Sequence, residues 1–203
     1  MRLAALALGL ALSAGAAAQA EPPQADGVWA DGLLSDADLY RLATCGAMPG
    51  GPCRGPVLRW EKPVLTLTVI AGDDPLPEGF AMPLVRAALH AVDEINAAGA
   101  GIRIELVPVG PADITLRPTA LVEGTALVEE PHFSGPGVMG VGYTTVWSYE
   151  DNVIIEAVVL ISTGITQADL TSVVLEEVTQ SLGFLYDIDG PAVVQRMSGV
   201  TRA

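Results

Sequence analysis

An amphipathic segment near the C-terminus constrains the fold of this chain more than any other feature. Its apolar residues recur at helical spacing and form one broad face, made by Leu170, Val173, Val174, Val178 and Leu182. Thr166 and Asp169 form a capping-box pair that predicts a helix start at about Gln167, and Gly183 predicts the end of the helix. The remainder of the chain must therefore supply a core that covers this apolar face.

Three polar residues of the same helix form the main chemical anomaly of the sequence. Glu177 lies at the edge of the apolar face, and Glu176 and Gln180 lie one turn apart beside it. An acid on the apolar side of a helix needs a partner, a raised pKa or a cleft. The spacing predicts that the three side chains converge in a partly buried polar cluster. An ion pair between Glu177 and an arginine, Arg103 or Arg117, is the alternative.

The run E-E-x-x-Q-x-L-G, which contains these residues, resembles the zincin motif H-E-x-x-H-x-x-G with both histidines replaced. In zincin peptidases the two histidines hold Zn²⁺ and the glutamate between them is the general base. The resemblance places Glu176 and Gln180 at the ligand positions and Glu177 at the position of the base. The third-ligand position of the longer motif falls on Tyr186, and Asp187 follows it. The candidate binding cleft is therefore Glu176, Gln180, Tyr186 and Asp187, and Glu177 is the candidate catalytic residue.

The donor atoms at these positions do not favour zinc. The amide oxygen of Gln180 is neutral and a weak ligand, and imidazoles supply much of the affinity of a zincin site. With Glu176 and Asp187 the ligand set would be entirely oxygen, which suits Ca²⁺ or Mg²⁺ better than Zn²⁺. The sequence therefore predicts no bound cofactor. If a metal does bind, these three residues are its expected ligands.

A broader resemblance covers most of the chain after residue 20. It is carried by SDADLYRLATCGAMPGGPCRGPVLRW near the start and by LEEVTQSLG near the end. Both stretches are similar to a bacterial family of secreted proteins known as a domain of unknown function, whose members look like relatives of the zincins. The resemblance implies a zincin-like fold and a location in the cell envelope, and it implies no activity.

The N-terminal residues predict export. Residues 1–20 combine a positive charge, an apolar run and a small-x-small cleavage site, as in a signal peptide. We expect an extended lead over residues 21–34 and a single zincin-like domain over residues 35–203. No later stretch is apolar for long enough to cross a membrane, so we expect a periplasmic or secreted protein.

The net charge and the cysteines indicate which classes of partner the protein can bind and which cellular compartment it occupies. The formal net charge is −14 and the one lysine is Lys62, so binding to nucleic acid is not expected. The acidity either keeps the protein soluble or serves to bind cations, and both interpretations stay open. Cys45 and Cys53 enclose the loop GAMPGGP, and in an oxidising compartment they are expected to form a disulfide.

The remaining patterns predict an α+β domain with a small mixed sheet. A capping box at Ser35 opens a short helix. The pattern then predicts a strand–helix–strand (βαβ) start, a further strand, a late hairpin and the C-terminal helix packed on the core. The expected elements after the first helix are Val64–Ala71, Met82–Ala98, Ile102–Val107, Asp113–Arg117, Val138–Trp147 and Val153–Ser162.

Three functions remain open from the sequence. The first is a zincin-like domain that is inactive as a zinc peptidase and binds a protein or peptide of the cell envelope. The second is a hydrolase that uses an oxygen-rich metal site or Glu177 as its general base. The third is a purely structural envelope protein.

Overall fold

The computed structural model describes residues 27–71, 75–127 and 137–189. The expected signal peptide and the first residues of the lead lie outside these ranges. The elements in chain order are β1 (Val28–Trp29), α1 (Asp36–Cys45), β2 (Val64–Val69), α2 (Ala81–Ala97), β3 (Arg103–Leu106), β4 (Ile114–Thr119), β5 (Gly142–Ser148), β6 (Ile154–Ser162), α3 (Leu170–Gln180) and β7 (Ile188–Asp189).

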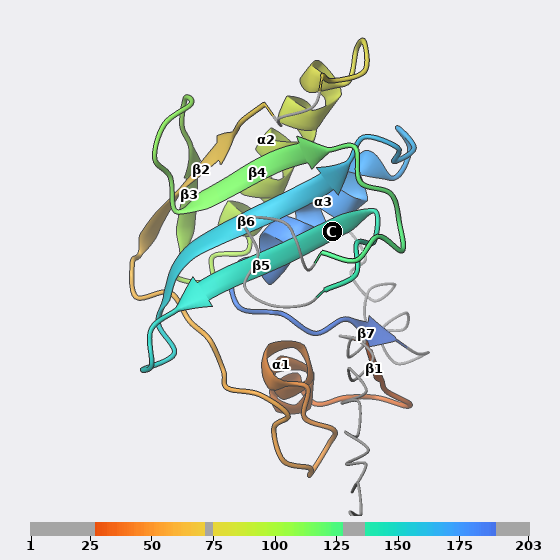
Figure 1. Cartoon of the computed structure of the whole chain (residues 1–203). Coiled ribbons are helices and arrows are strands. Elements are labelled where there is room, and N and C mark those ends of the chain that lie inside the picture. The colour runs from red at the N-terminus through yellow and green to blue at the C-terminus, as the bar shows by residue number, and fades with distance from the viewer. Residues whose placement is uncertain (1–26, 72–74, 128–136, 190–203) are drawn as a thin grey trace, which may run out of the picture.

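A five-stranded mixed sheet forms the centre of the molecule. Its strand order is β3-β2-β4-β6-β5, and every neighbouring pair is parallel except β5 with β6. Helices α2 and α3 lie together on one face of the sheet, while α1, β1 and β7 lie beyond its β5 edge (Figure 1). The α+β class, the βαβ start and the late hairpin predicted from the sequence are confirmed.

The main core lies between the sheet and the two helices. Two strands that are parallel neighbours need a crossover, and α2 provides it between β2 and β3. On α3, Val174 and Val178 are fully buried in this core, as the helical spacing predicts. Strand β6 is buried on both of its faces, because Val158 and Leu160 contact a second cluster with Leu127 on the far side of the sheet.

The predicted start of α3 at Gln167 is wrong by three residues. Thr166 Oγ1 does donate to Asp169 Oδ2 at 2.6 Å, but the N-cap of the helix is Asp169 rather than Thr166. The amide of Asp169 bonds to the carbonyl of Thr166, so the chain makes a tight turn before the helix begins at Leu170. The helix ends at Gln180, with Ser181 as its C-cap, slightly before the predicted stop at Gly183, which has a φ of 105° and turns the chain after the helix.

Strand β5 begins four residues later than the sequence predicts. Residues 138–139 pair instead with a loop, where the amide of Met139 bonds to the carbonyl of Thr125 and Val138 forms a bridge with Ala126. The ladder with β6 starts only at Gly142. The run from Val138 therefore pairs first with the loop near Ala126 and then with β6. An alternating sequence pattern does not show where the first pairing ends and the second begins.

A second, smaller unit joins the two ends of the described chain. Strand β1 pairs in parallel with β7, and the amide of Val28 bonds to the carbonyl of Asp187 at 2.7 Å. Val28, Ala30 and Leu34 are buried against Leu42 of α1. Part of the expected extended lead is therefore integral to the fold, and no local pattern in the sequence indicates this long-range pairing.

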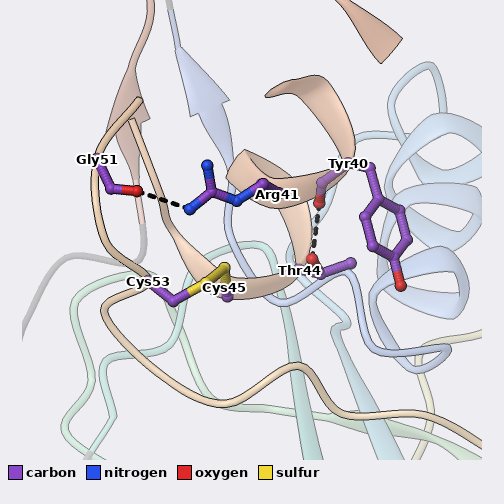
Figure 2. The surroundings of a disulfide bond; sticks show 6 residues. All are labelled: Tyr40, Arg41, Thr44, Cys45, Gly51 and Cys53. Carbon is purple, nitrogen blue, oxygen red and sulfur yellow. Dashed lines mark hydrogen bonds between the residues drawn. A yellow bond between two sulfur atoms is a disulfide. The ribbon is translucent and has the colours of Figure 1, made fainter. Parts of the chain in front are cut away.

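The disulfide predicted between Cys45 and Cys53 is confirmed, with Cα atoms 5.1 Å apart (Figure 2). It closes the loop that follows α1. Arg41 reinforces the loop by donating from Nη2 to the carbonyl of Gly51 at 2.6 Å. The disulfide and this hydrogen bond therefore attach the loop to the C-terminal half of α1.

One carboxylate links the strands β2 and β4. Asp113 Oδ2 accepts from the amide and the hydroxyl of Thr66 at 2.9 and 3.0 Å, and Oδ1 pairs with Lys62. Burial raises the pKa of Asp113, but the hydrogen bonds from Lys62 and Thr66 together outweigh it and hold the pKa below its ordinary value of 3.8. The ionised form therefore stabilises the fold.

We predict that Asp113→Asn lowers the free energy of unfolding by about 1–2 kcal/mol at neutral pH, because a charge-assisted network is lost. The pKa of Asp113 is lower in the folded state, so its contribution is complete above pH 3.8 and disappears as the pH falls through the folded-state pKa. Urea unfolding at neutral and acidic pH measures this. Glu105→Gln, which removes an exposed carboxylate paired with Arg103, is the control and should cost less. Equal losses for both variants would refute the assignment.

Candidate functional site

Helix α3 directs its three polar residues to two separate places. Glu177 is only 7% exposed and points toward the edge strand β5. Thr144 Oγ1 lies 2.7 Å from Glu177 Oε2 and 2.9 Å from the backbone oxygen of the same residue. A Cβ atom at Gly142 would overlap the carboxylate, so glycine is required for this close approach. The acid predicted to need a partner thus finds a hydroxyl donor across the helix–sheet interface.

In the described part of the chain, neither arginine proposed as an ion-pair partner of Glu177 faces that residue. Arg103 pairs with Glu105 on the surface, with 3.3 Å between Nε and Oε1. Arg117 lies beside Leu160 in the parallel ladder, and Leu160 faces the cluster on the side of the sheet away from α3. Side chains of paired residues leave a sheet on the same face, so Arg117 extends away from the helix.

Glu176 and Gln180 lie in a pocket, which we call the α3 pocket. It has a volume of about 380 Å³ and is bounded by the end of α3 and the segment that returns after Gly183. Gln180 Nε2 donates to Asp187 Oδ1 at 2.6 Å. The lining residues are Leu175, Glu176, Thr179, Gln180, Phe184, Tyr186, Asp187 and Ile188. The structure therefore brings together the four predicted cleft residues and separates the candidate base Glu177 from them.

The N-terminal unit sets the position of the returning segment. The amide of Tyr186 bonds to the carbonyl of Ala43 at the end of α1. The ring of Tyr186 lies against Gly46, where a Cβ atom would be 2.6 Å from Tyr186 Cε1. Tyr40 of α1 meets Phe184 edge to face, with ring centroids 6.2 Å apart. The α3 pocket therefore depends on residues from both ends of the chain.

The pKa of Glu176 in the α3 pocket depends on burial and on Asp187. Burial by the surrounding protein is the larger cause that raises the pKa of Glu176 above its ordinary value of 4.5, and repulsion from Asp187 raises it further. Glu176 itself is exposed as a residue, so water still screens it in part. The environment of the pocket therefore disfavours the charged form of Glu176.

The residues present do not fit a zinc peptidase site. Gln180 donates its amide N–H to Asp187, and the hydroxyl of Tyr186 is directed toward Gly55 rather than toward Glu176. The position of the general base falls on Glu177, which is held at β5. Within the described ranges, no group of three or more His, Cys, Asp or Glu side chains is arranged to hold a metal ion.

Sequence reasoning missed several residues of this region. Leu175 and Thr179 lie within one turn of Glu176, so helical spacing would have indicated them. Gly142 and Thr144 come from β5, and no local pattern associates them with the helix.

No protein-family model matches the chain, and no curated protein matches it. Among the residues that the structure describes, no helix is long and apolar enough to cross a membrane. Inferences about function therefore rest on the geometry of α3 and its surroundings.

We predict that Thr144→Val lowers the free energy of unfolding by about 1–3 kcal/mol, because the buried carboxylate of Glu177 loses a hydrogen-bond donor. Thr171→Val makes the same chemical change on the exposed side of α3 and is the control. Chemical denaturation of both variants measures the difference. Identical midpoints for the two would show that Thr144 does not stabilise Glu177.

We predict that Glu176→Gln makes the protein more stable at neutral pH, by less than about 1 kcal/mol because the residue is exposed. The folded-state pKa of Glu176 is raised, so the native protein loses stability as the pH rises from 4.5 through the folded-state pKa. The advantage of the variant should therefore vanish below pH 4.5. Thermal melts across this range measure it. Glu94→Gln, an exposed acid of α2, controls for the change in net charge.

Proposed function

We propose that this chain is a secreted or periplasmic zincin-like domain that binds a protein or peptide partner and does not cleave it. One observation carries the proposal. The three ligand positions of the motif, residues 176, 180 and 186, line one pocket, while the base position is engaged at β5. The geometry of a binding cleft is retained, and the groups that would activate water are not assembled in it.

Other features support the zincin-like fold and the location. Helix α3 follows the last strand of a five-stranded mixed sheet and packs beneath its antiparallel edge strand β5. The Cys45–Cys53 disulfide is typical of proteins in an oxidising compartment such as the periplasm or the extracellular space. The sheet arrangement agrees with the zincin-like fold expected from the sequence, and the disulfide agrees with the expected export.

The α3 pocket is also suited to a polypeptide partner. Its walls combine aliphatic and aromatic side chains, Leu175, Phe184 and Ile188, with a small number of polar groups. Such a mixture is typical of sites that recognise a ligand rather than of a plain structural surface.

We predict that the mature protein binds no stoichiometric Zn²⁺ and cleaves no member of a mixed peptide library, with or without added metal. The double change Glu176→His and Gln180→His should create a zinc site around Asp187, which already lies 2.6 Å from Gln180. We expect Zn²⁺ to raise the melting temperature of this variant by several degrees, as linkage requires.

Metal analysis, thermal melts and mass spectrometry of the peptides measure these outcomes. Adding Asp187→Asn to the double variant removes the third ligand and should diminish the zinc-dependent shift. Peptide cleavage that the native chain performs and Glu177→Gln abolishes would refute the inactive domain. A folded double variant without any zinc-dependent shift would refute the zincin-like geometry.

A further inference from the structure

The two walls of the α3 pocket belong to different apolar clusters. Leu175 of the helical wall packs against the main core between the sheet and the two helices. The other wall, residues 184–188, packs on the N-terminal unit, which comprises residues 27–55. Tyr186 and Ile188 of that wall contact a small cluster whose buried members are Val28, Ala30, Leu34 and Leu42. The second wall is therefore positioned by a unit that the main core does not include.

Tyr186 connects this wall to the disulfide loop. Its ring lies against Gly46, the residue after Cys45, where a Cβ atom would be 2.6 Å from Tyr186 Cε1. Its hydroxyl lies beside Gly55, just beyond Cys53, where a Cβ atom would be 3.0 Å from the hydroxyl oxygen. The disulfide therefore joins the two ends of the loop that hold the ring of Tyr186.

The N-terminal unit is small, and its other contacts with the second wall are few in each place. The amide of Tyr186 bonds to the carbonyl of Ala43 at 3.1 Å, and the ladder of β1 with β7 has two residue pairs. Units of fewer than about 40 residues usually need a disulfide to be stable. Among the described residues, the main core includes no member of the N-terminal unit. The unit can therefore open locally without unfolding of the five-stranded sheet.

We propose that the Cys45–Cys53 disulfide is a redox-sensitive switch of the α3 pocket. Its reduction by a dithiol detaches the N-terminal unit from residues 184–188 and opens the pocket, while the sheet, α2 and α3 stay folded. The inference rests on the proposed function, because it describes the regulation of the proposed binding site. In a reducing compartment the pocket is incomplete, and oxidation of the two cysteines completes it.

The exposure of the two cysteines determines where the reductant attacks. Cys53 is exposed, whereas Cys45 is fully buried at the end of α1 (Figure 2). A thiolate of the dithiol attacks Sγ of Cys53, the S–S bond breaks, and Cys45 leaves as a thiolate that takes up a proton. The second thiol of the reductant then displaces Cys53 and is itself oxidised to a disulfide. Two electrons and two protons thus pass from the dithiol to the protein.

The test compares the oxidised mature protein with the same sample reduced by dithiothreitol, and mass spectrometry confirms complete reduction. Amide hydrogen exchange is followed by NMR. The amides of Tyr186 and Val28 bond across the boundary between the N-terminal unit and the second wall, so reduction should accelerate their exchange at least about tenfold. The amides of Ile70 and Ala157 bond within the five-stranded sheet and should change by less than about twofold.

Two variants separate the covalent bond from other effects of the reductant. Cys53→Ser removes the exposed partner of the disulfide, so it should show the fast exchange of the reduced protein and should not respond to dithiothreitol. Met48→Ser changes an exposed side chain of the same loop and keeps the disulfide. This control should keep the slow exchange of the oxidised protein and should respond to dithiothreitol as the native chain does.

Unchanged exchange of the Tyr186 amide in the fully reduced protein would overturn the inference, because the pocket wall would not depend on the disulfide. Equal acceleration of all four amides would overturn it as well, since the disulfide would then stabilise one cooperative unit rather than the pocket. The experiment uses no ligand, so either result leaves the proposed binding function as it stands. Peptide cleavage by the oxidised protein would contradict the binding function and would leave the redox switch as it stands.

Discussion

The burial of the apolar face of α3 is the constraint on which the rest of this structure depends. Val174 and Val178 are fully buried between the sheet and α2, and this contact fixes the rotation of the helix about its axis. Once the rotation is fixed, successive residues must point in directions about 100° apart. Glu177 is consequently directed to β5, and Glu176 is directed to the α3 pocket.

The α3 pocket exists because the two ends of the described chain meet beside the helix. Trp60 donates from Nε1 to the carbonyl of Ser181 at 2.9 Å and anchors the end of α3. After Gly183 the chain returns, pairs with β1 and contacts the loop closed by the disulfide. The N-terminal unit therefore acts as a support for one wall of the pocket, and its covalent closure limits how far that wall can move.

The arrangement of acids gives the two carboxylates of α3 different roles. Glu177 is buried and hydrogen-bonded by Thr144, so it contributes to the contact between helix and sheet. Glu176 is exposed and lies in the α3 pocket, where burial and, less strongly, repulsion from Asp187 raise its pKa. Neighbouring residues of the same chemical type thus come to lie in two different environments, one at the helix–sheet interface and one in a pocket.

The sequence by itself determined the α+β class, the apolar face of α3 and the disulfide, because periodicity, capping and cysteine spacing are local signals. It also indicated Glu176 and Gln180, two of the α3 residues that line the pocket. Only the tertiary structure decided that Thr144 and Gly142 receive Glu177, and that β1 pairs with β7. These contacts join segments far apart in the chain. Their formation depends on which surfaces the packed core leaves adjacent, and no short-range pattern encodes that information.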